Sequence, residues 1–521
     1  MNGSNHIIEK VVVEINTGSR KTAEVIKDNV SAFLERELFP RLEQLLDKYH
    51  HSGGLVRFNS LNLEIATLRF DTFKNMEPEI IRRLAEKLES SVGTVNGKKV
   101  TDSEEKGSIE RISASRNRED TFLFFLGNGY LPWFGRKAYI DELTTFSTWE
   151  KSVAEKNDFI HRLVNVLKKK PEAVDRLVLQ FDPEIAALFL AQTYSGYREV
   201  EKKMLSFIEK QTSQFRRLFL KFLLLIFTGH ETKYLLQTAR DLAAEVYASE
   251  SSAMDKKRKD AVFEVKAIIR KAVDIQLKTK PEQKDELSVF LNLLRFPEPG
   301  ENEPLALKPD LKMGRSKEKR LKKDTVPENG SNGTEGQETI SAPENAEWLP
   351  FFEKEEGEIA VTNAGLVLLH PFLKPFFETV DISDEHGNIN EARRHLAVQL
   401  VHYLAAGEED FFESDLVFCK FLCGVPLEMP VPRANLLTQS EKNEASQLLK
   451  EVIKHWGALK NTSLDGLRQM FLQRNGKLFK KEKNYKLIVE RKAQDILLDK
   501  LGWNISLVKI PWLQELLYVD W

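Results

Sequence analysis

A short box of aromatic residues around a Leu-Pro pair occurs twice in this chain, as YLPWF at 130–134 and as WLPFF at 348–352. Proline fixes φ and ends a helix, while the flanking aromatic rings carry large apolar areas. Such a box ends one element and packs the following turn onto a neighbouring surface. Because each copy follows a long polar stretch, the repeat predicts two related helical modules.

These boxes supply the candidate functional residues, which either anchor a module or bind a partner. The first box consists of Tyr130, Leu131, Pro132, Trp133 and Phe134. The second box consists of Trp348, Leu349, Pro350, Phe351 and Phe352. A weaker echo near the C-terminus contains Trp512, and the apolar tail ends at Trp521. An apolar tail of this kind is normally docked, either on its own domain or on a partner.

The composition is that of a protein with large hydrophobic cores and little net charge. The 521 residues predict about three domains, and 32 Phe with 41% hydrophobic residues are ample for their cores. The formal net charge is −2, so no global charge calls for nucleic acid or an acidic membrane.

The longest apolar run, at 218–227, contains Lys221 and is half the roughly 20 residues that a membrane-spanning helix needs. We therefore expect a buried core helix there and no membrane insertion. The two cysteines, Cys419 and Cys423, exclude a disulfide scaffold. Together with the absence of a visible signal peptide, they favour the cytoplasm, with particle association as an alternative.

Patterning predicts a mainly helical, multi-domain protein whose modules are joined by disordered linkers. The expected units are a small α+β N-terminal module (1–92), a polar linker (93–118), a helical module (119–296), a Pro/Gly/Lys-rich linker (297–346) and a mostly helical C-terminal module (347–521). The second linker holds six prolines and a Gly/Asn/Ser run, a composition that buries too little apolar surface to fold.

The N-terminal module is expected to run strand, helix, strand, helix. Residues 6–15 are rich in Ile and Val, and 61–65 alternate apolar with polar residues, so both predict strands. Residues 21–49 and 77–92 show helical spacing. Pro40 lies within the first of these and should kink the helix or start a second one.

The other two modules carry repeated helical patterns. In the helical module these cover 148–170, 183–193, 199–228, 232–249, 255–280 and 281–296, and Pro171, Pro183 and Pro281 stand where they could open helices. In the C-terminal module they cover 391–406, 411–422, 440–456 and 463–475. Residues 478–489 predict a strand that turns Tyr485, Leu487 and Val489 to one face.

Catalytic and cofactor motifs are missing, so we predict no enzyme and no cofactor. Gly127-Asn128-Gly129 lacks the spacing and the following Lys-Ser/Thr of a phosphate loop. Cys419 and Cys423 with His395 and His402 could form a Cys₂His₂ site if their helices cross, but the spacings are not those of a zinc finger. Buried core thiols are the favoured interpretation, and no metal is predicted.

A basic run at 308–323 offers an electrostatic contact to nucleic acid or to an acidic protein surface. No aromatic residues are interleaved for base stacking, so a solvated linker is favoured and no nucleic-acid partner is expected.

Several stretches resemble the contractile injection system tape measure proteins, which are encoded with phage-tail-like particles. The resemblance lies in residues 6–15 with 61–65, in FLFFLGNGYLPWF at 122–134, in NAGLVLLHPFLKPFF at 363–377, in Cys423-Gly424, and in the Trp-rich C-terminus. It implies an assembly role in setting tube and sheath length, with other particle subunits (tube, baseplate or cap proteins) as partners. It supplies no catalytic residues.

The composition of the chain does not fit a ruler made of one long helix. One continuous helix of this length would span about 780 Å. The sequence instead contains 19 prolines, 26 glycines and three apolar blocks, without a sustained heptad repeat. Two interpretations stay open: a chain that extends inside the growing tube, or a folded assembly factor. A third hypothesis is a soluble adaptor or chaperone that binds another subunit through the boxes or the tail.

Overall fold

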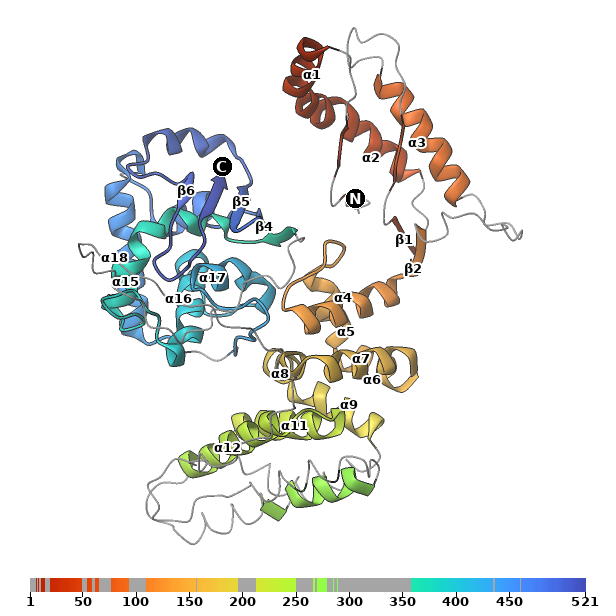
Figure 1. Ribbon diagram of the computed structural model, residues 1–521, viewed down its shortest axis with the longest axis vertical. Coiled ribbons are helices and arrows are strands. Elements are labelled where there is room, and N and C mark those ends of the chain that lie inside the picture. The colour runs from red at the N-terminus through yellow and green to blue at the C-terminus, as the bar shows by residue number, and fades with distance from the viewer. Residues whose placement is uncertain are drawn as a thin grey trace, which may run out of the picture.

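The computed structural model (Figure 1) describes residues 6, 8, 11–14, 19–48, 54–58, 61–64, 76–92, 109–155, 157–194, 212–249, 266–267, 269–278, 284, 288, 358–433, 436–459 and 461–521. The fold is mainly helical with small sheets, and the N-terminal module is α+β, as predicted. The second box and the basic run at 308–323 lie outside the described residues.

The N-terminal module packs helices around a small core. The helices are α1 (Arg20–Phe33), the π-turn η1 (Leu34–Leu38), α2 (Phe39–Asp47) and α3 (Met76–Val92). Pro40 lies in the first turn of α2, directly after the π-turn η1, and the chain stays helical from Arg20 to Asp47. The predicted irregularity at Pro40 therefore takes the form of a π-turn within one helical segment. Leu45, Leu84 and Leu88 are buried between α2 and α3.

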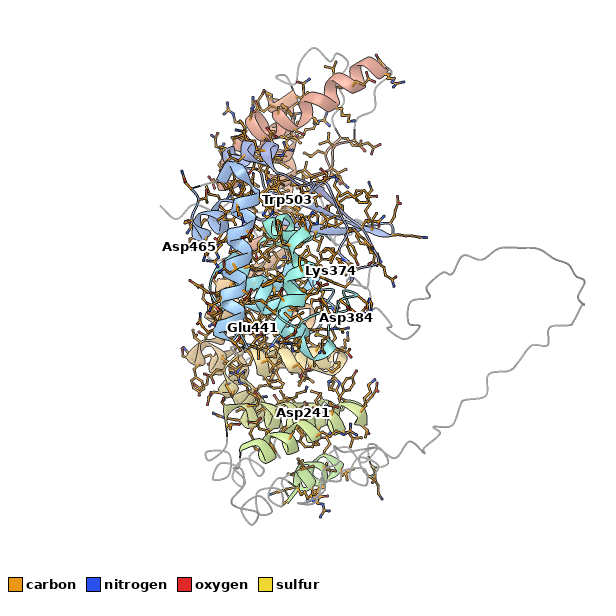
Figure 2. The ribbon with its side chains drawn as sticks, turned by 90° about the vertical axis from the view of Figure 1, so that its left-hand side faces the viewer. Asp241, Lys374, Asp384, Glu441, Asp465 and Trp503 are labelled. Atoms are coloured by element: carbon orange, nitrogen blue, oxygen red, sulfur yellow. The ribbon has the colours of Figure 1, made fainter. Side chains whose placement is uncertain are left out.

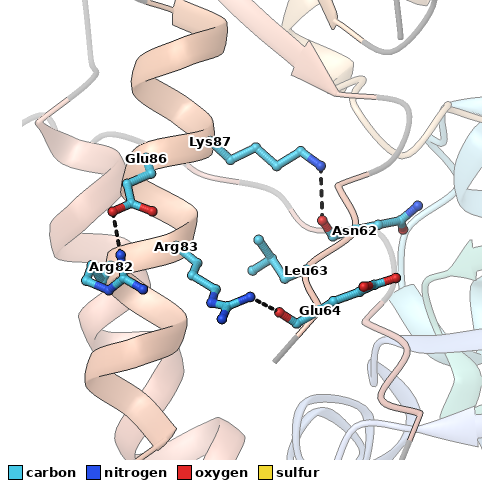
Figure 3. A pocket seen from close by; sticks show the side chains of 7 residues that line it. All are labelled: Asn62, Leu63, Glu64, Arg82, Arg83, Glu86 and Lys87. Atoms are coloured by element: carbon cyan, nitrogen blue, oxygen red, sulfur yellow. Dashed lines mark hydrogen bonds and ion pairs between the residues drawn. The ribbon is translucent and has the colours of Figure 1, made fainter. Parts of the chain in front are cut away.

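The two-stranded sheet of this module does not use the predicted strands. β1 (Gly54–Phe58) pairs antiparallel with β2 (Ile109–Ser113), while 11–14 and 61–64 are irregular. The 61–64 segment lies beside α3, where Arg83 and Lys87 donate hydrogen bonds to the backbone carbonyls of Glu64 and Asn62. Figure 3 shows these contacts at the rim of an open pocket of about 440 Å³. The cationic side chains of α3 therefore form hydrogen bonds with backbone carbonyls that would pair with a neighbouring strand if this segment lay in a sheet.

The end of the predicted first linker is folded. Residues 109–118 form β2 and the start of α4 (Ala114–Asn128), whose N-cap Ser113 accepts a hydrogen bond from the Arg116 amide. Their charged side chains have partners, because Arg116 pairs with Asp120 at 3.1 Å and Arg118 pairs with Glu142 at 3.3 Å. The polar composition here serves a packed helix rather than a tether.

The helical module packs its helices around one core. Besides α4 they are α5 (Lys137–Thr144), α6 (Phe146–Glu155), α7 (Asn157–Lys169), α8 (Pro171–Gln180), α9 (Pro183–Thr193), α11 (Ser213–Thr228) and α12 (Thr232–Ser249). Pro171 and Pro183 open α8 and α9 as predicted, whereas Pro281 lies outside the described residues. The predicted helix at 148–170 is split into α6 and α7.

The apolar run at 218–227 lies in α11, which is buried along most of its length, as expected of a core helix. Among the described residues, no helix is long and apolar enough to cross a membrane.

The C-terminal module combines helices with a five-stranded sheet that sequence patterning predicted only in part. Its longer helices are α15 (His370–Thr379), α16 (Arg394–Ala406), α17 (Val417–Leu422) and α18 (Gln439–His455). Short turns of helix complete it: η4 (Ala364–Leu369), η5 (Glu391–Arg393), η6 (Glu413–Leu416), η7 (Gly457–Leu459), α19 (Leu464–Leu467), η8 (Arg468–Leu472) and η9 (Ala493–Lys500).

The sheet has strand order β3-β4-β5-β7-β6. The strands are β3 (Glu358–Val361), β4 (Gly476–Lys481), β5 (Asn484–Val489), β6 (Leu507–Val508) and β7 (Leu517–Asp520). β5 and β7 are parallel, and the other pairs are antiparallel. Tyr485, Leu487 and Val489 are all buried on one face of β5, which confirms that prediction.

A candidate functional site at the junction of the modules

Three charged side chains are buried where the helical and C-terminal modules meet. Arg176 of α8 pairs with Glu413 of η6, with Nε and Oε2 3.1 Å apart. The other carboxylate oxygen of Glu413 accepts from Lys420 Nζ at 2.6 Å. All three side chains are 0% exposed. We call Arg176, Glu413 and Lys420 the buried triad.

The remaining donors of the triad are also satisfied. Arg176 donates to the carbonyls of Leu126 and Glu428, and Lys420 donates to the carbonyl of Leu427. Burial holds the pKa of Lys420 below its usual value, although the negative charge of Glu413 acts in the opposite direction. A buried ion group of this kind contributes little net stability but is costly to break, because a lost partner leaves a charge unpaired.

Aromatic packing closes the same junction. The ring of Phe412, at the start of η6, stacks on Phe125 of α4 with centroids 4.5 Å apart and belongs to the core of the helical module. Nearby, the Gln180 side chain donates to the carbonyl of Val431 at 2.6 Å. Figures 1 and 2 show the C-terminal module directly beside the helical module. The two modules therefore share a core across the second predicted linker.

The first box lies at the same place and contacts all three modules. Tyr130 packs against the core of the C-terminal module, and Leu131 packs against the core of the helical module. The Arg57 guanidinium of β1 lies 3.6 Å from the centre of the Phe134 ring, a cation–π contact. Pro132 is buried, and Trp133 is 37% exposed. In this structure the box is a junction between modules.

Gly129, just before the first box, is a position where only glycine fits. Its φ is +80°, and a Cβ would lie 2.8 Å from Arg176 Nη2 and 3.0 Å from Glu413 Oε1. We expect Gly129→Ala to lower the free energy of unfolding by about 1–3 kcal/mol, through left-handed strain and displacement of the triad. Urea unfolding measures this loss.

Gly127→Ala is the matched control for that substitution. It lies two residues away, inside α4, and its nearest neighbour would be Val166 at an ordinary 3.7 Å. The control should be neutral or stabilising by up to about 1 kcal/mol, because alanine favours helix. Equal effects of the two substitutions would show that Gly129 is not constrained by the triad.

The C-terminal candidates lie within their own module. Trp512 is buried, stacks on Phe377 at 5.2 Å, and donates its indole N–H to the carbonyl of Leu422 at 2.8 Å. Trp521 is half-buried and donates to Asp495 at 3.2 Å. The tail between them contains β7, an interior strand of the sheet. These two tryptophans therefore anchor the end of the chain.

The four Cys and His residues are not assembled into a metal centre. Cys419 and Cys423 are free and buried, and burial raises the pKa of both thiols. His402 contacts the carbonyl of Asp410 at 3.3 Å, and burial with the nearby Lys420 charge lowers the pKa of His395. Within the part of the chain that the structure describes, no three His, Cys, Asp or Glu side chains are placed to hold a metal ion.

The helical and C-terminal modules are joined through this buried junction, and the first box links them to the N-terminal module. The chain belongs to the contractile injection system tape measure protein family, whose family model matches residues 5–521. Comparison with curated proteins and with solved structures gave no match. Sequence patterning missed the triad, because its members look like ordinary surface charges until they are paired.

Proposed function

We propose that this protein is a non-enzymatic assembly component of a contractile injection particle and that it helps set tube and sheath length while folded. Its partners would be tube, baseplate or cap subunits, met in the cytoplasm as the particle assembles. Membership of the tape measure family supports the assembly role. The observation that carries the folded form is the Arg176–Glu413 pair, which joins positions 237 residues apart on either side of the 297–346 segment.

An extended ruler would have to give up this junction. Stretching the chain between the modules separates Phe412 from Phe125 and exposes both rings, which lie in one core. Burying aromatic side chains of this size stabilises by roughly 2–3 kcal/mol each, so extension carries a substantial cost before any other contact breaks. The folded form is therefore the better description of the working protein.

An insertion into the 297–346 segment separates the two mechanisms. We expect about 40 Gly/Ser residues placed after Gly330 to leave particle length unchanged, because the added chain lies between modules that are already joined. A chain stretched end to end would instead lengthen particles by up to about 130 Å. Electron microscopy of purified particles measures the length distribution.

Exchange of residues 301–340 for Gly/Ser at constant length controls for the identity of the segment. Growth in proportion to the insert would overturn the folded mechanism and support a ruler. Particles of normal, uniform length in a strain lacking the protein would overturn the assembly role itself.

The adaptor hypothesis is less well supported by these contacts. It relied on the boxes and the tail as free binding elements, yet Tyr130, Pro132, Phe134 and Trp512 all contact other parts of the chain. Trp133 is the member of the first box that stays exposed. Partner binding is better sought on a surface that the fold leaves open.

A further inference from the structure

The five-stranded sheet of the C-terminal module buries one face and leaves the other open. Leu478, Leu487 and Val519 point into the core and are at most 6% exposed. On the opposite face Ile488 is 41%, Tyr518 44% and Leu507 46% exposed. Exposed apolar side chains gathered on one surface mark interaction sites more often than scattered ones do.

Strand register aligns these side chains into a row. Phe479 of β4 is opposite Lys486 of β5, Lys486 is opposite Tyr518 of β7, and Tyr518 is opposite Leu507 of β6. At about 4.8 Å per strand, the row crosses roughly 14 Å. Ile488 extends it one step along β5. We call Phe479, Lys486, Ile488, Leu507 and Tyr518 the outer sheet face.

The cation in the row is neutralised locally, so the face is not repulsive to apolar groups. Lys486 Nζ lies 2.5 Å from a carboxylate oxygen of Asp520, which lies diagonally across from it on β7, opposite Ile488. Lys477, beside Ile488, pairs in the same way with Glu358 of β3 at 3.3 Å. Apolar contacts and one tyrosine hydroxyl remain for a partner to use.

Positive charge lies at one end of the row. The β4–β5 hairpin carries Lys481 at the end of β4, on the same face as Phe479, and Lys483 in the turn, beside a single acid, Glu482. For these two lysines no ion pair is found with any of the residues that the structure describes. The turn consists of Glu482 and Lys483, and Glu482 lies three residues beyond Phe479. A partner that covers the row would therefore bring its end close to these lysines.

We propose that the outer sheet face docks an acidic amphipathic segment of another particle subunit. Its apolar side chains would cover Ile488, Leu507 and Tyr518, and its carboxylates would meet Lys481 and Lys483. Charge complementarity selects an acidic segment, because a basic one would be repelled by the turn. This inference rests on the proposed function for the pool of partners and adds the surface and the chemistry.

Photo-crosslinking in particle-producing cells tests the surface directly. Tyr518 is replaced by p-benzoylphenylalanine, and the crosslinked peptide is sequenced by mass spectrometry. We expect a peptide of another particle subunit that carries net negative charge and apolar residues. The same replacement at Phe146, an exposed aromatic on α6 (54% exposed), is the matched control and should not capture that peptide.

Charge reversal tests the role of the turn. K481E and K483E together should lower the yield of that crosslink roughly tenfold, because two rim contacts turn from attraction to repulsion. Reversal of Lys168 and Lys169, both exposed on α7, makes the same charge change elsewhere and should leave the yield unaltered. Thermal unfolding of both variants confirms that each remains folded.

Three results would overturn the proposal: a crosslink to residues of this same chain, a crosslink to a second copy, or a crosslink to a basic segment. The proposal would also be overturned if reversing the charges of Lys481 and Lys483 left the crosslink yield unchanged. These failures are distinguishable from failure of the proposed function, which is measured as particle length in the deletion strain. Altered length without the expected crosslink removes the docking surface alone.

Discussion

Replacing Glu413 with alanine is expected to lower the free energy of unfolding by about 3–5 kcal/mol. The substitution removes the one acid of the buried triad and leaves Arg176 and Lys420 buried without a counter-charge. This loss is large for a single substitution, since most surface substitutions change the free energy of unfolding by no more than about 0.5 kcal/mol. Equilibrium urea unfolding followed by circular dichroism measures the loss.

A matched control distinguishes burial from charge. Glu391→Ala also removes a carboxylate from an arginine, Arg394 at 3.3 Å, but Glu391 is 85% exposed, so its loss should cost less than about 1 kcal/mol. Replacing Arg176, Glu413 and Lys420 together by Met, Leu and Met should recover much of the stability. Equal costs for Glu413→Ala and Glu391→Ala would show that the triad is not a dry ion group.

The second large effect is expected at the end of the chain. Leu517→Ala with Val519→Ala should lower the free energy of unfolding by about 4–6 kcal/mol, because both side chains fill the core from β7. β7 is an interior strand that joins β5 to β6, so its loosening exposes two further strand edges. Soluble yield and urea unfolding report the loss.

The control uses the other face of the same strand. Tyr518→Ala with Asp520→Ala keeps the backbone of β7 and changes only side chains that point outward. We expect this variant to lose less than about 1 kcal/mol, because exposed positions contribute little to the core. If both pairs destabilise equally, the inward and outward assignment of β7 is wrong.

Local patterning predicted much of the helical structure. Period-3.6 apolar spacing placed α9 and α12 at their observed bounds, and Pro171 and Pro183 open helices where the sequence indicated. The buried side of β5 was also predicted, because alternation along one strand is a local property. These features depend on neighbours a few residues apart.

The sheets and the junction between the modules could not be predicted from local patterning. β2 lies in a segment whose polar composition predicted a linker, and its partner β1 is more than 50 residues away. In the C-terminal module, β3 pairs with β4 across more than 100 residues. Short strands give weak local signals, and pairing over such distances depends on the rest of the fold.

The sequence alone determined the mainly helical class, the starts of several helices and the family resemblance, because each rests on short-range spacing or on motif order. Only the tertiary structure decided where the first box packs and which charges are buried. Arg176 and Glu413 look like surface residues in sequence, and the first box could either anchor a module or bind a partner. Whether a side chain is buried or paired depends on residues that are distant in the sequence, so it is determined only once the modules have packed together.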